Sequence, residues 1–282
     1  MTSDVARNQW YPISDIEALP VGIAAERILM GDSLTVTRGA GDSVTVTSDR
    51  YGTLPVVIRF GHVWTSPGQP QRELFDIPEA LHEGRRHVPC GCIRVRCSPL
   101  RAVENFLDIA HFPFVHTDIL GVEEHPEVAK YDVRIDETND EIWATKVRFF
   151  QPQAAASATG GIITEYMYRV PAPTVAILYK TCPAREGEWD IITLFVQPVG
   201  EDICHVWPWM ALYDDGSSMT DMIQFQQVIF LQDRSILENQ VPALLPLDPK
   251  MEIPTRADMT SIAYRRWLKR TGYYYGASTE AA

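Results

Sequence analysis

Hydrophobic and polar residues alternate along much of the second half of the chain. Period-two runs of this kind are typical of strands with one buried face, and short polar segments such as 138–140 and 200–202 separate them. Strands that follow one another through tight turns form antiparallel meanders. The pattern therefore predicts an antiparallel sheet whose strands cover residues 131–135, 141–150, 162–170, 174–181, 189–196 and 203–212.

Three segments have helical rather than strand-like spacing. The first starts at Ser98, a good N-cap, and its apolar stripe continues to Ala110. Residues 221–240 contain neither Gly nor Pro and predict a long helix. Residues 257–269 predict a closing helix that packs onto the rest of the chain. The order of elements indicates an α+β fold in which a curved antiparallel sheet wraps a long helix, a helix-grip architecture whose hollow suits a flat apolar ligand.

The N-terminal quarter follows a different pattern. Residues 33–38 and 43–48 alternate around a Gly-rich turn, which predicts a hairpin, and residues 54–65 predict more strand. The segment 67–70, Pro-Gly-Gln-Pro, is typical of a linker. We therefore divide the chain into a small β-rich unit at 1–70 and a larger domain at 71–282.

Charge and composition exclude several classes of partner. The net charge of −12 opposes binding to nucleic acid or to an anionic membrane. Nowhere do 18 uncharged apolar residues run together, and the N-terminus lacks a hydrophobic core of signal-peptide length. Five Cys, an odd number, suit a reducing compartment. These features predict a soluble cytoplasmic protein.

Cysteine clusters at one place, Cys90, Cys92 and Cys97, on a strand predicted over 88–97. On such a strand Cys90 and Cys92 would share one face and Cys97 would take the other. Structural thiols explain the cluster best. Metal ligation is a weaker alternative, because no further His or Cys follows at a zinc-type spacing.

Acid and imidazole groups fall at a metal-site spacing only at the first helix. Asn105, Asp108 and His111 lie three residues apart and share a neighbouring face. On one straight helix His111 and His116 would point about 140° apart and could not bind one ion. Pro113 should end the helix just after His111, so that His116 can turn back toward it.

A third ligand must then come from elsewhere, and Asp233 on the long helix is the best candidate. Gln226, Phe230 and Asp233 lie within about 60° of one another on that helix, so one face presents an amide, a ring and an acid. Two His and one carboxylate suit Fe(II) and O₂, with Zn(II) as the chemical rival. The alternative for Asp233 is an exposed residue paired with Arg234.

The segment 104–116 resembles the mononuclear-iron motif of Rieske non-haem iron oxygenases, and 232–240 resembles the segment that carries their third ligand. By that resemblance His111, His116 and Asp233 hold Fe(II). The resemblance also makes Asp108 the bridging acid that passes electrons from a Rieske cluster in a neighbouring subunit, and Asn105 a polar residue beside the metal. It implies a catalytic domain of the START/Bet v1 type.

The N-terminal unit is similar to the Rieske domain of the same oxygenases at 8–12, 49–50 and 59–65. After residue 50, however, the family carries Cys-x-His and then Cys-x-x-His, which hold the [2Fe-2S] cluster. Here the sequence continues Tyr-Gly-Thr-Leu-Pro-Val, and neither motif occurs anywhere in the chain. We therefore expect residues 1–70 to be a truncated remnant without cluster ligands, and no [2Fe-2S] centre in this chain.

Within the family the chain is similar to Rieske-lacking catalytic subunits of bacterial methylxanthine N7-demethylases, which act in caffeine degradation. The resemblance implies a monooxygenase that uses O₂ to convert 7-methylxanthine to xanthine and formaldehyde. In that reading Gln226 recognises an edge of the purine and Phe230 its face or methyl group. The alternative is that Gln226 is a solvated helix residue and Phe230 belongs to the core.

The resemblance also implies partners. They are an NAD(P)H-dependent reductase that carries the missing Rieske centre, a companion subunit similar to glutathione S-transferases, and a trimer-based hetero-oligomer. Two other functions remain open at this point. One is O-demethylation of a methoxylated aromatic acid such as vanillate, and the other is a non-catalytic helix-grip binding or accessory subunit.

Overall fold

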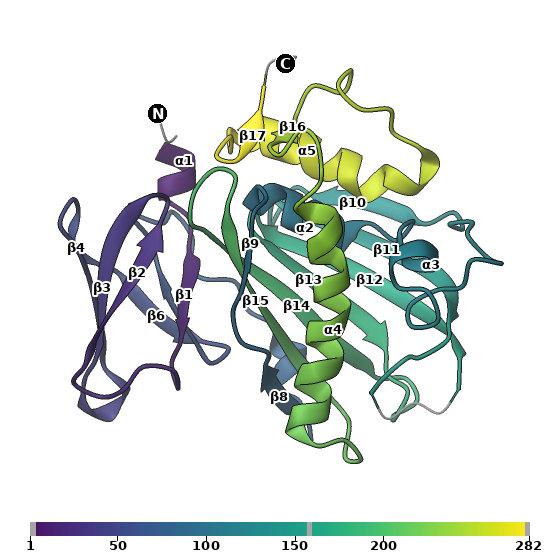
Figure 1. Ribbon diagram of the computed structural model, residues 1–282, viewed down its shortest axis with the longest axis horizontal. Helices are drawn as coiled ribbons and strands as arrows, with labels where there is room; N and C mark the ends of the chain where they lie inside the picture. Colours follow the sequence, from purple (N-terminus) through teal and green to yellow (C-terminus); the bar gives the residue numbers. More distant parts are fainter. Residues whose placement is uncertain (1–3, 157–159, 280–282) are drawn as a thin grey trace.

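The computed structural model of the chain describes residues 4–156 and 160–279. A large antiparallel sheet fills the centre, two small sheets lie at its N-terminal side, and the longest helix lies across one face of the large sheet (Figure 1). The structure is therefore of the predicted α+β class. Within the described residues no helix is both long and apolar enough to cross a membrane.

The N-terminal elements form two small antiparallel sheets after the short helix α1 (Asp4–Arg7). The predicted hairpin is present, with Val36 opposite Val46. The three-stranded sheet has the order β1-β7-β6 and the four-stranded sheet β2-β3-β4-β5. Their strands are β1 (Tyr11–Asp15), β2 (Ala24–Leu29), β3 (Asp32–Arg38), β4 (Val44–Ser48), β5 (Gly52–Leu54), β6 (Val56–Arg59) and β7 (His62–Thr65).

The predicted meander forms the large sheet. Its strands pair in the order β10-β11-β12-β13-β14-β15-β8, so that strands adjacent in sequence are mostly adjacent in the sheet, and β9 also pairs with β15. The strands are β8 (Arg86–Pro89), β9 (Ile93–Val95), β10 (Asp132–Asp136), β11 (Glu141–Gln151), β12 (Ile162–Ala172), β13 (Val175–Thr181), β14 (Trp189–Pro198) and β15 (Cys204–Leu212).

The single strand predicted over 88–97 is wrong in one respect. The chain leaves the sheet between β8 and β9, where Gly91 has a φ of 79° that favours glycine. This break separates the two thiols that a continuous strand would have placed on one face. Cys90 is buried, whereas Cys92 is exposed.

The two faces of the large sheet are covered by different elements. Ile177, Phe195 and Trp209 point to the face on which the N-terminal sheets lie, where they share one buried aromatic cluster with Trp64 and the half-buried Phe60. The opposite face carries the main core and is covered by helices (Figure 1). The sheet is thus covered on both sides, and a pocket beside helix α4 lies on its helical side.

The helices are α2 (Pro99–Leu107), α3 (Phe112–Val115), α4 (Met219–Leu237) and α5 (Met259–Thr271). Helix α4 runs across β13, β14 and β15 in Figure 1. Helix α5 packs onto the rest of the chain, as predicted, and buries Trp267 and Leu268. The remaining short elements are the 3-10 turns Ala40–Asp42, Pro78–Leu81 and Arg256–Asp258 and the strands β16 (Leu245–Pro246) and β17 (Ala277–Ser278).

Candidate metal centre and pocket

Helix α2 begins as predicted but ends earlier. The Ser98 hydroxyl accepts a hydrogen bond from the backbone N–H of Leu100, as an N-cap should. Asp108 already has extended backbone, with ψ at 131°, and its carboxylate accepts a hydrogen bond from Ala110 N at 2.8 Å. The side chain of Asp108 thus replaces the next helical bond and ends α2 at Leu107. The prediction that the helix runs to His111 is wrong.

Pro113 does not break a helix but lies in the first turn of a new one. Its missing N–H costs nothing there, because the first N–H groups of a helix have no partner within the helix. His111 is the N-cap and His116 the C-cap of this single turn, α3. The turn reverses the chain between the two histidines, and their ring centroids come within 5.0 Å of each other.

Helix α4 contributes the third group. Ser218 and Asp221 form a capping box at its N-terminus. Its buried stripe consists of Met222, Gln226, Phe230, Asp233 and Leu237, so two polar residues occur on a face that packing would otherwise make apolar. Arg234 pairs with Glu238 rather than with Asp233. The alternative of an exposed Asp233 paired with Arg234 is therefore excluded by the structure.

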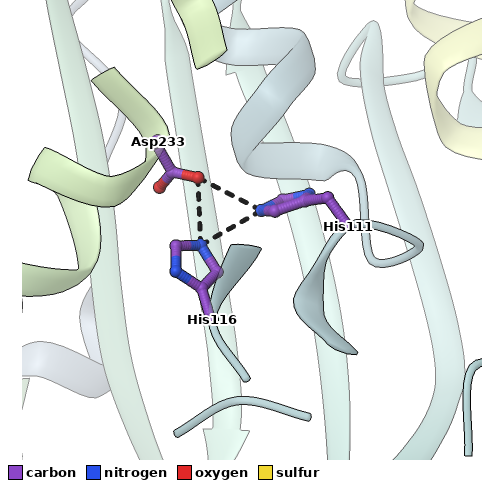
Figure 2. A group of neighbouring side chains, drawn as sticks. All are labelled: His111, His116 and Asp233. Atoms are coloured by element: carbon purple, nitrogen blue, oxygen red, sulfur yellow. Dashed lines mark hydrogen bonds and ion pairs between the residues drawn. The ribbon is translucent and has the colours of Figure 1, made fainter. Parts of the chain in front are cut away.

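Three donor atoms from two distant segments of the chain, the turn α3 and helix α4, meet at this point (Figure 2). The Nε2 atoms of His111 and His116 are 3.2 Å apart. Oδ1 of Asp233 lies 3.2 Å from Nε2 of His111 and 3.0 Å from Nε2 of His116. The described residues contain no other group of three His, Cys, Asp or Glu that meets the same distance criterion.

The other nitrogen of each imidazole has its own partner. Nδ1 of His111 donates to Oδ2 of Asp108 at 3.0 Å, and Nδ1 of His116 donates to Oε1 of Gln232 at 2.8 Å. A carboxylate and an amide oxygen only accept, so both Nδ1 atoms carry the proton and both Nε2 atoms face the centre. Two lone pairs and a carboxylate oxygen in van der Waals contact repel one another unless a cation lies among them.

When no metal is bound, a second proton on His111 provides the positive charge. Burial lowers the pKa of His111, but hydrogen bonds to Asp108 and Asp233 outweigh it and raise the pKa to about 9. Burial on its own would raise the pKa of Asp233. The hydrogen bonds from both histidines outweigh this effect and lower the pKa to about 2. The arrangement stabilises positive charge at its centre.

The residues also fit a metal ion. Three donors at right angles, each about 2.1 Å from an ion, lie about 3.0 Å apart, which agrees with the three observed separations. All three donors lie to one side, which leaves the remaining positions free for other ligands. Hydrogen bonds to the second nitrogen of ligating histidines are a common feature of metal sites.

A pocket opens beside the three donors, between α4 and the helical face of the sheet. The predicted residues Asn105, Gln226 and Phe230 all line it together with the donors. Gln226 and Phe230 are buried, and the Gln226 amide forms no hydrogen bond to another side chain among the described residues. Gln226 is therefore not a solvated helix residue. Asp108 lies on the far side of His111, outside the lining of the pocket.

Sequence reasoning missed several polar residues here. Gln232, which orients His116, directly precedes Asp233, so its position was a usable signal. Lys180 and Asp190 line the pocket from β13 and β14. Strand alternation could have indicated Lys180. It lies two residues after Leu178 in an otherwise apolar strand, so both side chains point to the same face of the sheet, which lines the pocket.

Comparisons with known proteins agree with this fold. Residues 95–272 match the family described as vanillate O-demethylase oxygenase C-terminal domain. The chain is 42% identical over 271 residues to the probable methylxanthine N7-demethylase NdmC of Pseudomonas sp. (strain TJI-51), covering 96% of each protein. It is 25% identical over 169 residues to the methylxanthine N1-demethylase NdmA of Pseudomonas putida, covering 60% of this chain and 46% of that protein.

Solved structures show the same fold at low sequence identity. Pseudomonas putida CBB5 NdmA with caffeine has a TM-score of 0.76 at 18% identity, covering 94% of this chain and 91% of that one. Dicamba monooxygenase bound to 3,6-dichlorosalicylic acid has a TM-score of 0.75 at 14% identity, covering 94% and 97%.

The chain has the α+β fold of the oxygenase structures to which it is similar. The family match and the 42% identical relative make the assignment specific. The chain belongs to the Rieske non-haem iron oxygenases, within the vanillate O-demethylase oxygenase family. The reading as a non-catalytic binding or accessory subunit is accordingly set aside.

Proposed function

We propose that this chain is the catalytic component of a multicomponent monooxygenase that removes an N-methyl group from a methylxanthine. The observation that carries the proposal is the meeting of His111, His116 and Asp233 at the wall of a largely apolar pocket. The substrate class rests on the relative that is 42% identical over nearly the whole chain.

His111, His116 and Asp233 would hold Fe(II), and Asn105 would lie beside it. Bound Fe(II) supplies the activation of O₂, so that one oxygen atom enters the methyl C–H bond and the other leaves as water after uptake of two electrons and two protons. The resulting N-hydroxymethyl group falls apart to formaldehyde and the N–H purine. Two nitrogen donors and one carboxylate with open positions favour Fe(II) over the closed geometry of structural zinc.

The pocket residues of α4 would hold the purine. Phe230 offers a flat apolar surface, and the Gln226 amide can both donate to and accept from the ring edge. Exclusion of water by these side chains protects the reacting group. The preferred substrate in this proposal is 7-methylxanthine, which gives xanthine.

Electrons must come from another protein. Asp108 contacts His111 from the side opposite the pocket, so it would pass electrons to the metal site from the Rieske cluster of a neighbouring subunit or reductase. We also propose that residues 1–70 are a Rieske-like remnant without a cluster. The separate small sheets of that region and the start of the family match at residue 95 support this division. A glutathione S-transferase-like companion and a trimer-based assembly belong to the same proposal.

Reconstitution tests the function directly. The full chain is loaded with Fe(II) and mixed with NADH and a Rieske-containing reductase, and formaldehyde release and O₂ uptake are measured with 7-methylxanthine, paraxanthine, theobromine and caffeine. We expect formaldehyde and xanthine from 7-methylxanthine in equal amounts. Iron-loaded protein that releases no formaldehyde from any methylxanthine would overturn the proposal.

The name of the matching family favours one alternative, O-demethylation of a methoxylated aromatic acid. The same assay with vanillate distinguishes the two functions. Formaldehyde from vanillate but not from methylxanthines would assign the O-demethylase activity.

A further inference from the structure

The register of the large sheet places a polar pair in the wall of the pocket. Lys180 on β13 lies directly opposite Asp190 on β14, and both line the pocket. The neighbouring row across the same strands, from Tyr168 through Leu178 and Ile192 to Met210, is nearly apolar and also lines it. The pocket therefore has an apolar floor with one polar edge.

Both members of the pair are buried and only partly satisfied. Lys180 is 4% exposed and donates to the backbone oxygen of Ala154, although an ammonium group has three donors. Asp190 is 3% exposed, its Oδ1 accepts from Tyr213 N at 3.2 Å, and its carboxylate also interacts with the Cys182 thiol. Among the described residues no direct ion pair joins the side chains of Lys180 and Asp190.

Burial acts on both groups in the direction of neutrality. It lowers the pKa of Lys180 and raises the pKa of Asp190, while each partly offsets the effect on the other. Such groups are costly to bury unless a partner completes their hydrogen bonds. Because the two side chains border a cavity, a ligand in the pocket can provide that partner.

Two other polar side chains that line the pocket, Asp214 and Gln151, are already engaged by neighbouring groups. The Asp214 carboxylate accepts from Ser217 N and Ser217 Oγ, both at 2.8 Å, and from Gly216 N at 2.9 Å. The Gln151 side chain accepts from the Tyr166 hydroxyl at 3.0 Å. These contacts shape the wall and leave Lys180 and Asp190 as a donor and an acceptor side by side.

We propose that Lys180 and Asp190 are specificity-determining residues that together recognise a carbonyl oxygen beside a ring N–H. Lys180 donates to the carbonyl oxygen, and Asp190 accepts from the adjacent N–H. This inference rests on the proposed function, since the six-membered ring of xanthine has such an edge. A methyl group on that nitrogen removes the donor and meets the carboxylate instead. The pocket thus selects purines methylated on the imidazole ring and free on the six-membered ring.

Direct titration of the full chain tests this without turnover. Dissociation constants are measured by calorimetry for 7-methylxanthine, which keeps both N–H groups of the six-membered ring, and for caffeine, which has neither. We expect 7-methylxanthine to bind at least roughly tenfold more tightly, because a site built for a hydrogen bond rejects a ligand that lacks it. Equal binding of the two purines would overturn the inference.

Substitutions at Lys180 and Asp190 test whether these two residues cause the preference for 7-methylxanthine. Asp190→Leu should weaken 7-methylxanthine roughly tenfold and leave caffeine within about threefold, whereas Asp190→Asn, which keeps an acceptor oxygen, should restore part of the loss. Lys180→Met should weaken both ligands, since both have carbonyl oxygens. The matched control is Thr193→Val, a buried polar change on β14 that faces away from the pocket. An Asp190→Leu protein that keeps the wild-type preference contradicts the assignment.

A second ligand pair separates this inference from the proposed function. If the wild-type chain binds no methylxanthine, the substrate class is wrong, and uracil and 1,3-dimethyluracil then test the pair alone, because uracil has the same edge without an imidazole ring. A preference for uracil that Asp190→Leu removes supports the pair. No preference for uracil overturns it. Circular dichroism melting curves establish that each variant is folded.

Discussion

At the scale of the residue, each histidine of the candidate metal centre is oriented by a side chain that is not itself one of the three donors. Asp108 holds His111 and Gln232 holds His116, each through the nitrogen that faces away from the centre. This fixes the tautomer and the ring plane before any ion arrives. A residue that would bind the metal and a residue that orients such a ligand should therefore respond differently to substitution.

Replacing a donor should remove the metal. His111→Ala deletes one of three ligands, so we expect iron content below about a tenth of the wild-type value with a melting temperature that changes little. Metal analysis by mass spectrometry measures this. His125→Ala, an exposed histidine outside the centre, is the matched control and should keep its iron. Full iron occupancy in His111→Ala would show that the ligand set is wrong.

Replacing Asp108, the proposed bridging acid, should separate iron binding from turnover. Asp108→Asn keeps an oxygen that can accept from His111 Nδ1, so iron should stay, but it removes the negative charge that we propose links the iron to the Rieske cluster of a partner. We expect formaldehyde formation with the reductase to fall by at least about tenfold. Iron content and turnover are measured on the same preparation. Turnover at the wild-type rate contradicts the electron-relay role.

Gln226→Leu should change which methylxanthine is accepted. The substitution removes a buried amide from the pocket wall, so substrates that hydrogen-bond to it lose more than substrates that do not. The measurement is the ratio of kcat/KM for 7-methylxanthine to that for theobromine, with an expected change of about tenfold or more. Gln224→Leu, at an exposed position of the same helix, is the control. An unchanged ratio argues against a role of Gln226 in recognition.

At the scale of the element, the single turn α3 is the part on which the centre depends most. One helical turn has no stability of its own, so its position is set by packing. The chain after α3 folds back so that Gly121 packs against this turn. A Cβ added at Gly121 would lie 2.8 Å from Pro113 N and 3.0 Å from the carbonyl carbon of Phe112. These are backbone atoms that cannot rotate away, so the close approach requires glycine.

Gly121→Ala should therefore displace α3 and the two histidines at its ends. We expect a lower affinity for Fe(II), by about tenfold, because small errors in ligand position weaken a metal site. Titration of the metal-free protein measures the dissociation constant. Gly160→Ala, where an added Cβ meets nothing within 4 Å, should bind iron as the wild type does. Equal affinity of the Gly121→Ala protein would show that α3 is not held by this contact.

At the scale of the whole molecule, the N-terminal sheets and the large sheet share a core. The Phe60 ring lies 5.3 Å from Trp209, 5.6 Å from Phe195 and 5.5 Å from Phe75, measured between centroids. The proposed division at residue 70 is thus crossed by a continuous aromatic cluster. The N-terminal sheets help to cover the face of the large sheet that lies opposite the pocket, whatever their own function.

We therefore expect the two parts to unfold together. Phe60→Ala removes a half-buried ring from the shared cluster and should lower the free energy of unfolding by about 2 kcal/mol while thermal unfolding stays a single transition. Ile58→Ala, 41% exposed on the neighbouring strand, should cost less than about 0.5 kcal/mol. Two separate transitions in Phe60→Ala would show that the parts are independent.

The sequence by itself determined the strands of the meander, the two longest helices of the large domain and the residue types of the centre. Strand alternation, the turns between strands and the apolar stripe of α4 are local patterns, and the structure confirms the meander and the face shared by Gln226, Phe230 and Asp233. The resemblance of the segments 104–116 and 232–240 to known motifs also indicated the family. Local patterns failed where a side chain replaced a helical backbone hydrogen bond. At the end of α2 the Asp108 carboxylate accepts from Ala110 N in place of a backbone carbonyl.

Only the tertiary structure decided which groups meet. Asp233 reaches His116 across 117 residues of sequence, Gln232 orients that histidine, and Lys180 faces Asp190 in the wall of the pocket. The physical reason is that spacing along a chain sets the direction of a side chain within its own element. The distance between side chains of different elements is set by how sheets and helices pack, and packing is a property of the whole fold.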